Sequence, residues 1–157
     1  IPQVEITSCG PNRKPLEGRG EYPGYLACHL FARDEAFTTG APGEWMDCRF
    51  PKVTQDGRDG DEEPGYVANL RDGAAAGFKY FTCQGTRVVS IRVRGYCKGA
   101  FEVKTSWDGP SLGSIPVDFT NEFKAYAADI AIPDGVQALY FQYTGHGAAN
   151  LASFALG

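Results

Sequence analysis

The chain has 157 residues, of which 43% are hydrophobic and 13% aromatic, and its formal net charge is −4. This length and aromatic content suffice for one folded domain with its own core, which excludes an intrinsically disordered chain. The acidic balance leaves no basic surface for nucleic acid, and no apolar run approaches the roughly 20 residues that span a bilayer. We therefore expect neither nucleic acid nor a membrane as a partner.

The N-terminus, Ile1 to Glu5, lacks the basic and apolar regions of a secretory signal. We interpret this start as a cut within a longer protein, so that any export signal would lie upstream. The compartment, extracellular or cytoplasmic, then depends on the parent protein.

In the N-terminal part we predict strands at Val4–Ser8 and Tyr25–Phe31. Residues 10–24 and 32–44 are rich in Pro, Gly and charged residues, so we predict them as loops. The stretch 56–65 is the most polar part of the chain. A calcium-binding EF-hand loop needs a Glu at its twelfth position, and a loop that starts at Asp56 or Asp59 has no Glu there. A solvated surface loop is the first interpretation of this stretch, and some other cation site is the alternative.

The second half alternates with period two. Over 87–94, Val89, Ile91 and Val93 share one face while Ser90, Arg92 and Arg94 occupy the other, as expected of a half-buried strand. Further strands are predicted at 66–70, 77–83, 100–104, 123–132, 137–144 and 150–156. The predicted core consists of Val89, Ile91, Val93, Phe101, Val103, Leu139 and Phe141.

No segment shows a sustained helical period, and the segment 72–76 is predicted to be a turn because of its flanking glycines. Many short strands joined by Gly-rich turns predict an all-β protein, a two-sheet antiparallel β-sandwich of the jelly-roll type. No linker separates two cores. We expect one domain over 1–157, with an irregular part at 1–65.

The five cysteines, Cys9, Cys28, Cys48, Cys83 and Cys97, show no CxxC pair and no histidine at zinc-like spacing. Buried free thiols on strands are the first interpretation, and one disulfide with three thiols is the alternative.

Catalytic patterns are missing. His29 lies in an apolar stretch and His146 in a Gly-rich turn, and neither accompanies a nucleophile motif such as G-x-S-x-G. The 19 acidic residues are numerous enough to supply the two carboxyl groups of a glycosidase, but most of them fall on outward strand positions or in loops. We predict no hydrolytic activity for this chain alone.

Aromatic residues are the remaining signal, because a sugar site combines aromatic planes over C–H faces with polar groups at the hydroxyls. Any single aromatic side chain in a sandwich more often belongs to the core. The candidates at loops or strand ends are Tyr22, Trp45, Tyr66, Tyr96, Trp107 and Phe123.

The second half contains, in this order and spacing, the segments Tyr66–Gly73, Ala76–Phe81, Val88–Gly95, Gly99–Val103, Asp108–Gly113, Gly135–Phe141 and Gly147–Leu151. Through these segments, residues 66–157 resemble family 6 carbohydrate-binding modules. The opening segments Val4–Gly10 and Tyr25–Cys28 look like the C-terminal region of family 43 glycoside hydrolases, β-xylosidases and α-L-arabinofuranosidases, that carry such a module. The resemblance implies a non-catalytic module appended to a family 43 catalytic domain.

The resemblance also implies site residues. In the family, two aromatic side chains grip one sugar ring and an Asn bonds its hydroxyls, which by position are Tyr66, Phe123 and Asn150. Phe123 stands where the family usually has Trp, so the stacking platform is smaller. The family's structural calcium would retain Glu5, but Thr7 and Ala152 replace two carboxylates, so we expect a degenerate metal site and no cofactor.

Two functions follow as hypotheses. The first is a module that binds xylan, arabinoxylan or xylo-oligosaccharides, or their chain ends, and targets a linked hydrolase. The alternative is a structural accessory domain that packs on the catalytic domain without a sugar site, and an independent small hydrolase is a weaker third. An open groove with parallel Tyr66 and Phe123 rings favours binding, and an occluded one favours the accessory domain.

Overall fold

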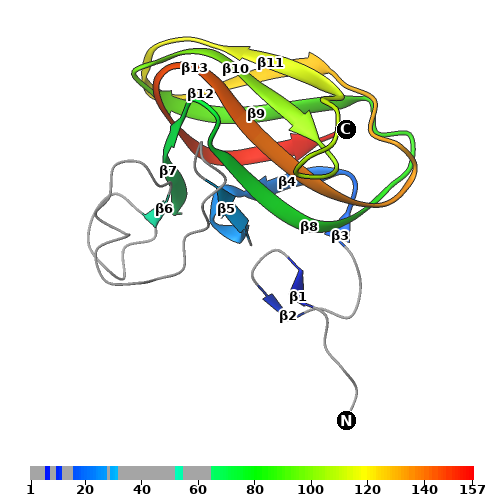
Figure 1. Cartoon of the computed structure of the whole chain (residues 1–157). Coiled ribbons are helices and arrows are strands. Elements are labelled where there is room, and N and C mark those ends of the chain that lie inside the picture. Colours follow the sequence, from blue (N-terminus) through cyan, green and yellow to red (C-terminus); the bar gives the residue numbers. More distant parts are fainter. Residues whose placement is uncertain (1–5, 8–9, 12–15, 28, 32–51, 55–64) are drawn as a thin grey trace.

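The computed structural model describes residues 6–7, 10–11, 16–27, 29–31, 52–54 and 65–157 (Figure 1). These residues form strands and a single 3-10 turn, and none of them builds a helix long and apolar enough to cross a bilayer. The elements are β1 (Ile6–Thr7), β2 (Gly10–Pro11), β3 (Leu16–Glu17), β4 (Gly20–Pro23), η1 (Gly24–Leu26), β5 (His29–Phe31), β6 (Lys52–Thr54), β7 (Tyr66–Arg71), β8 (Ala75–Cys83), β9 (Val88–Gly95), β10 (Cys97–Lys104), β11 (Gly113–Val117), β12 (Thr120–Asp129) and β13 (Gly135–Leu156).

Two sheets share the long strand β13. Its first half pairs with β8 and β10, and β11 extends that sheet beyond β10. Its second half pairs with β9 on one side and with β7 and then β4 on the other. Figure 1 shows the orange start of β13 beside β8 and β10 and its red end beside β4 and β9. The predicted all-β sandwich is confirmed.

β13 passes from one sheet to the other through two glycines. Gly145 and Gly147 have φ values of +141° and +75°, a region that side chains rarely adopt. A Cβ atom on Gly147 would lie 1.7 Å from the carbonyl oxygen of Tyr96. Only glycine permits this crossing, which brings Asn150 into the second sheet.

The predicted core is buried. Val89, Ile91, Val93, Phe101, Val103, Leu139 and Phe141 each expose no more than 1% of their surface. Phe154 lies at the centre of an aromatic cluster, with its ring centroid 4.6 Å from that of Phe78 and 5.0 Å from that of Phe141. Alternation along each strand therefore placed the correct face inward.

The buried Tyr143 hydroxyl donates a hydrogen bond to the carbonyl of His146, next to the crossing glycines. Burial, with smaller contributions from Cys97 and Asp72, raises the pKa of Tyr143 to about 12. The phenol therefore keeps its proton, and its hydrogen bond to the turn, across the neutral range.

The prediction of a loop over 10–24 is wrong. Strands β2, β3 and β4 lie within it, and β4 pairs with the end of β13. The Tyr22 ring packs on Phe81 at 5.2 Å and on Phe154 at 5.7 Å between centroids. Glycine and proline conceal the period of this short segment, and its partner strand lies more than a hundred residues away in the sequence.

Other boundaries differ from the prediction. The segments 137–144 and 150–156 are one strand, the predicted strand over 25–31 is η1 followed by the short β5, and Ala75 and Ala76 begin β8 instead of forming a turn. Strand β11 was not predicted, although Ile115 and Val117 are buried. The pairing is not wholly antiparallel, because β3 runs parallel to β8.

Cys83 and Cys97 are free, buried thiols on β8 and β10. Burial raises the pKa of both thiols, with Asp134 adding to this near Cys83 and Asp118 near Cys97, although the hydroxyl of Thr86 lowers the pKa of Cys83. For these two residues the prediction of buried thiols is confirmed. Cys9, Cys28 and Cys48 lie outside the described residues.

Candidate functional site: an aromatic cluster across four strands

Four consecutive strands of the second sheet, β12, β9, β13 and β7, bring the candidate residues together. Arg94 on β9 lies opposite Asn150 on β13, and the next pair, Val93 and Leu151, is buried. Because successive side chains point to opposite faces, Arg94 and Asn150 lie on the face away from the core. The structure thus places these side chains together on one outer face.

Phe123 and Tyr66 come from the two outer strands of this set. Phe123 lies where the pairing of β12 with β9 shifts register, between Thr120 and Lys124, and Tyr66 is the first residue of β7. Strands are spaced about 4.8 Å apart, so the two backbones lie about 14 Å apart across β9 and β13. The rings lean toward each other over this distance, and their centroids are 5.4 Å apart.

The two rings are not parallel. Their planes meet at 64°, which is an edge-to-face contact. The guanidinium carbon of Arg94 lies 4.4 Å from the Phe123 centroid and 5.2 Å from the Tyr66 centroid, within the range of cation–π attraction. The site is therefore a three-membered cluster. Arg94 is predicted from the sequence to lie on the outward face of its strand, but it is not among the predicted site residues.

A sugar gripped between two parallel rings needs about 7–8 Å between their centroids, because each carbon–carbon contact takes about 3.5–4.0 Å. The observed 5.4 Å is too short. The two rings contact each other and the Arg94 guanidinium lies against both of them, so a sugar enters between the rings only after they separate. The parallel, open groove that would favour binding is not present.

Asn150 is anchored on one side and open on the other. Its Oδ1 accepts a hydrogen bond of 3.1 Å from the backbone N–H of Asn69, a residue with φ +64°. The Asn69 side chain in turn accepts a 2.9 Å bond from Nε of Arg71. Among the described residues, the Asn150 amide nitrogen has no hydrogen-bond acceptor. Its two N–H donors are therefore not used by the described residues.

The other aromatic candidates divide into three groups. Tyr22 packs on the core, and Trp107 packs on Tyr140, so both have structural roles. Tyr96 is 77% exposed. Trp45 lies outside the described residues.

The calcium ligands expected from the family are not assembled by the described residues. Ala152 carries no oxygen on its side chain, and Glu5 lies outside the described residues, as does the acidic stretch 56–64. No three His, Cys, Asp or Glu side chains gather as a metal site in the part of the chain that the structure describes. The residues seen here do not fit a family-type calcium site.

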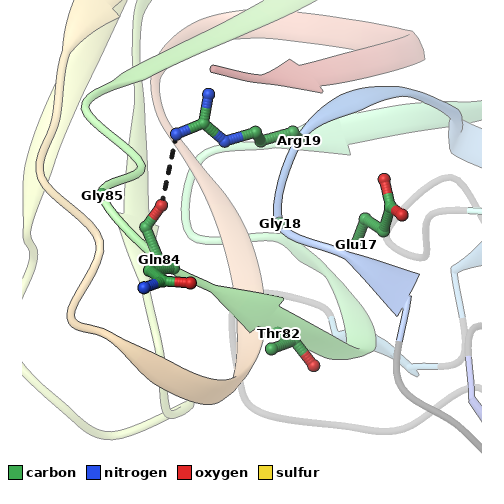
Figure 2. A pocket seen from close by; sticks show the side chains of 6 residues that line it. All are labelled: Glu17, Gly18, Arg19, Thr82, Gln84 and Gly85. Carbon is green, nitrogen blue, oxygen red and sulfur yellow. Dashed lines mark hydrogen bonds between the residues drawn. The ribbon is translucent and has the colours of Figure 1, made fainter.

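A separate hollow of about 480 Å³ lies between β3 and the end of β8 (Figure 2). It is lined by Glu17, Gly18, Arg19, Thr82, Gln84 and Gly85. Arg19 closes one side by donating a 3.4 Å hydrogen bond to the Gln84 carbonyl. None of the described residues that line it is aromatic, so they do not form a stacking surface like that of the cluster at Tyr66.

The chain is similar to part of a protein named "Xylosidase/arabinosidase" from Thermoclostridium stercorarium, with 61% identity over 156 residues. The match covers 99% of this chain but only 33% of that protein, so the chain spans about a third of the relative's length. No protein-family model matches the sequence.

Solved structures share the fold. A module named CsCBM6-3 from Clostridium stercorarium, with cellobiose, matches with a TM-score of 0.70 and 15% identity over 92% of this chain and 98% of that one. A family 6 module from Clostridium cellulolyticum, with xylose, matches with a TM-score of 0.70 and 13% identity over 90% and 98%. A family 43 arabinoxylan arabinofuranohydrolase from Bacillus subtilis matches with a TM-score of 0.65 and 15% identity over 91% of this chain and 28% of that enzyme.

These matches confirm the resemblance stated from the sequence. The two modules are matched over nearly their whole length and the arabinofuranohydrolase over only a part, which agrees with an appended domain and not a catalytic one. The chain has the fold of the family 6 carbohydrate-binding modules, and its sequence is similar to one third of a protein named xylosidase/arabinosidase.

Proposed function

We propose that this chain is a non-catalytic module that binds xylan-type chains or their ends and holds a linked family 43 hydrolase near its substrate. A linked module raises the effective concentration of the catalytic domain at the polysaccharide without any new contact at the catalytic site. The observation that carries the proposal is the meeting of Tyr66, Phe123 and Asn150 on one face, from three strands far apart in the sequence.

Two further observations support the xylan-type ligand. The relative that shares 61% identity is named for xylose- and arabinose-releasing activity, and a module of the same fold was solved with xylose. The Asn150 amide offers donors beside two rings, which is the combination that a sugar requires. We expect weak binding, with a Kd in the range of about 10 μM to 1 mM, because only a small apolar area is covered.

One observation favours the alternative, a structural accessory domain that packs on the catalytic domain without its own sugar site. The Tyr66 and Phe123 rings contact each other edge to face, and the Arg94 guanidinium lies against both. A closed cluster of this kind is what the accessory role predicts. Binding measurements with the chain itself separate the two functions.

Phe123→Trp tests the proposal directly. The larger indole restores the wider platform, and because Phe123 is only half-buried the added ring can extend into solvent. We expect xylo-oligosaccharides to bind about 3- to 10-fold more tightly, the scale of about 1 kcal/mol of added stacking. Isothermal titration calorimetry of the native chain and the variant measures this change.

Tyr80→Trp is the matched control, because it places the same indole at a half-buried aromatic ring on β8, in the other sheet. If neither the native chain nor Phe123→Trp gives binding heat, sugar binding is refuted. The accessory-domain function would then replace it.

We also propose that the chain needs no calcium. Ala152 supplies no ligand, so calcium or a chelator is expected to change the thermal unfolding midpoint by less than about 1 °C. Ala152→Asp returns one carboxylate and should make the midpoint more sensitive to calcium. A rise of several degrees when calcium is added to the native chain would contradict the proposal.

A further inference from the structure

A second pair of aromatic rings lies in the open. Tyr96 is 77% exposed and Phe119 is 50% exposed, yet their ring centroids are 4.8 Å apart with planes at 48°. The other large hydrophobic residues that are exposed in the described part of the chain, Val88 and Val136, are aliphatic. Single exposed apolar residues are common, but two adjoining exposed aromatic rings mark a binding surface more often.

This pair continues the strand ladder that carries the candidate site. Gly95 of β9 pairs with Thr120 of β12. Tyr96 follows Gly95 and Phe119 precedes Thr120, so both lie just beyond the same end of this antiparallel ladder. Arg94 precedes Gly95 on the same strand. Only Gly95, with φ +143°, lies between Arg94 and Tyr96, so the Cα atoms of these two residues are at most about 7 Å apart.

The backbone around the pair is fixed. The Tyr96 carbonyl accepts a 3.2 Å hydrogen bond from the N–H of Ala148, and the Phe119 N–H donates a 2.8 Å bond to Oδ1 of Asp118. The rings therefore start from anchored positions, which lowers the entropy lost when a ligand is stacked on them. The exposed Asp118 carboxylate adds acceptors for sugar hydroxyls beside the rings.

We propose that Tyr96 and Phe119 form a second stacking surface, which takes a further unit of the same xylan-type chain that is bound at Tyr66 and Phe123. The inference rests on the proposed function and makes it more specific. The preferred ligand is a stretch of several sugar units rather than a single chain-end residue, and affinity rises with chain length.

The test compares a short and a long ligand in the intact 157-residue chain. Calorimetry with xylobiose and xylohexaose is carried out on the native chain and on the double variant Tyr96→Ala/Phe119→Ala. We expect the native chain to bind xylohexaose more tightly than xylobiose. The double variant should lose about 3- to 10-fold in xylohexaose affinity, the scale of one stacked ring pair, and keep its xylobiose affinity.

Val136→Ala is the matched control, because it removes an exposed apolar side chain that is 57% exposed elsewhere on the molecule, and it should change neither affinity. Tyr96→Phe/Phe119→Tyr keeps both rings and should retain the native preference. Thermal unfolding confirms that each variant is folded.

Three results would overturn the inference. Native affinity that does not grow with chain length is the first, and an equal loss for both ligands in the double variant is the second. The third is a double variant that binds both ligands as the native chain does, in which case the rings serve another surface, such as contact with the linked catalytic domain. If the native chain binds neither ligand, the proposed function itself fails, and this inference fails with it.

Discussion

Tyr66→Ala is expected to abolish detectable binding of xylo-oligosaccharides. The Tyr66 ring contacts Phe123 at 5.4 Å and Arg94 at 5.2 Å, so its removal takes away one stacking plane and the contact that positions the other. A loss of about 2 kcal/mol weakens a native Kd of about 10 μM to 1 mM by about 30-fold, to about 0.3–30 mM, and over most of this range calorimetry detects no binding heat. Affinity gel electrophoresis on soluble xylan provides a second readout at high ligand concentration.

Two variants separate the role of the ring from an effect on folding. Tyr66→Phe keeps the ring and should retain binding. Tyr80→Ala removes a half-buried tyrosine from β8 in the other sheet and should leave affinity unchanged. Since Tyr66 is only half-buried, Tyr66→Ala should lower the free energy of unfolding by about 1 kcal/mol. A Tyr66→Ala chain that binds like the native one would place the sugar elsewhere.

Phe154→Ala is expected to produce the largest loss of stability, about 3–5 kcal/mol in the free energy of unfolding. Phe154 is 1% exposed, and its ring contacts those of Phe78, Phe81 and Phe141 from three directions. Its removal leaves a cavity that rigid strands on both sides cannot close. Urea denaturation followed by tyrosine and tryptophan fluorescence measures the change.

Phe119→Ala is the matched control for this substitution. The Phe119 side chain is half exposed, so the same chemical change should cost less than about 1 kcal/mol. Equal losses for the two variants would mean that the stability of the sandwich does not depend on the aromatic cluster around Phe154.

The candidate site was only partly predictable. Tyr66, Phe123 and Asn150 came from the family resemblance, and the strand order β12–β9–β13–β7 explains why they meet. The sequence indicated two other features only weakly: that Arg94 belongs to the ring cluster, and that the Asn69 N–H holds the Asn150 side chain. Arg94 lies on the correct face of a predicted strand, and asparagine, as at position 69, is one of the few residue types that tolerate a positive φ.

The ring angle and the contact of Arg94 with both rings had no sequence signal at all. They depend on where the register shift between Thr120 and Lys124 leaves Phe123, and such a shift arises from pairing between strands rather than from either strand alone. This is the feature on which the choice between a sugar-binding module and an accessory domain depends.

The sequence by itself determined the fold class and the buried face of each strand. Val89, Ile91 and Val93, and likewise Phe101 and Val103, are buried as their alternation predicts, because a period of two is a property of a single strand. Tertiary structure decided what no short segment contains. The pairing of β4 with β13, the single long strand that crosses between sheets at Gly145 and Gly147, and the contact between Tyr66 and Phe123 join residues far apart in the sequence. Such contacts form only when the whole sandwich closes, because bringing distant segments together costs conformational entropy, and only burial of the shared core offsets that cost.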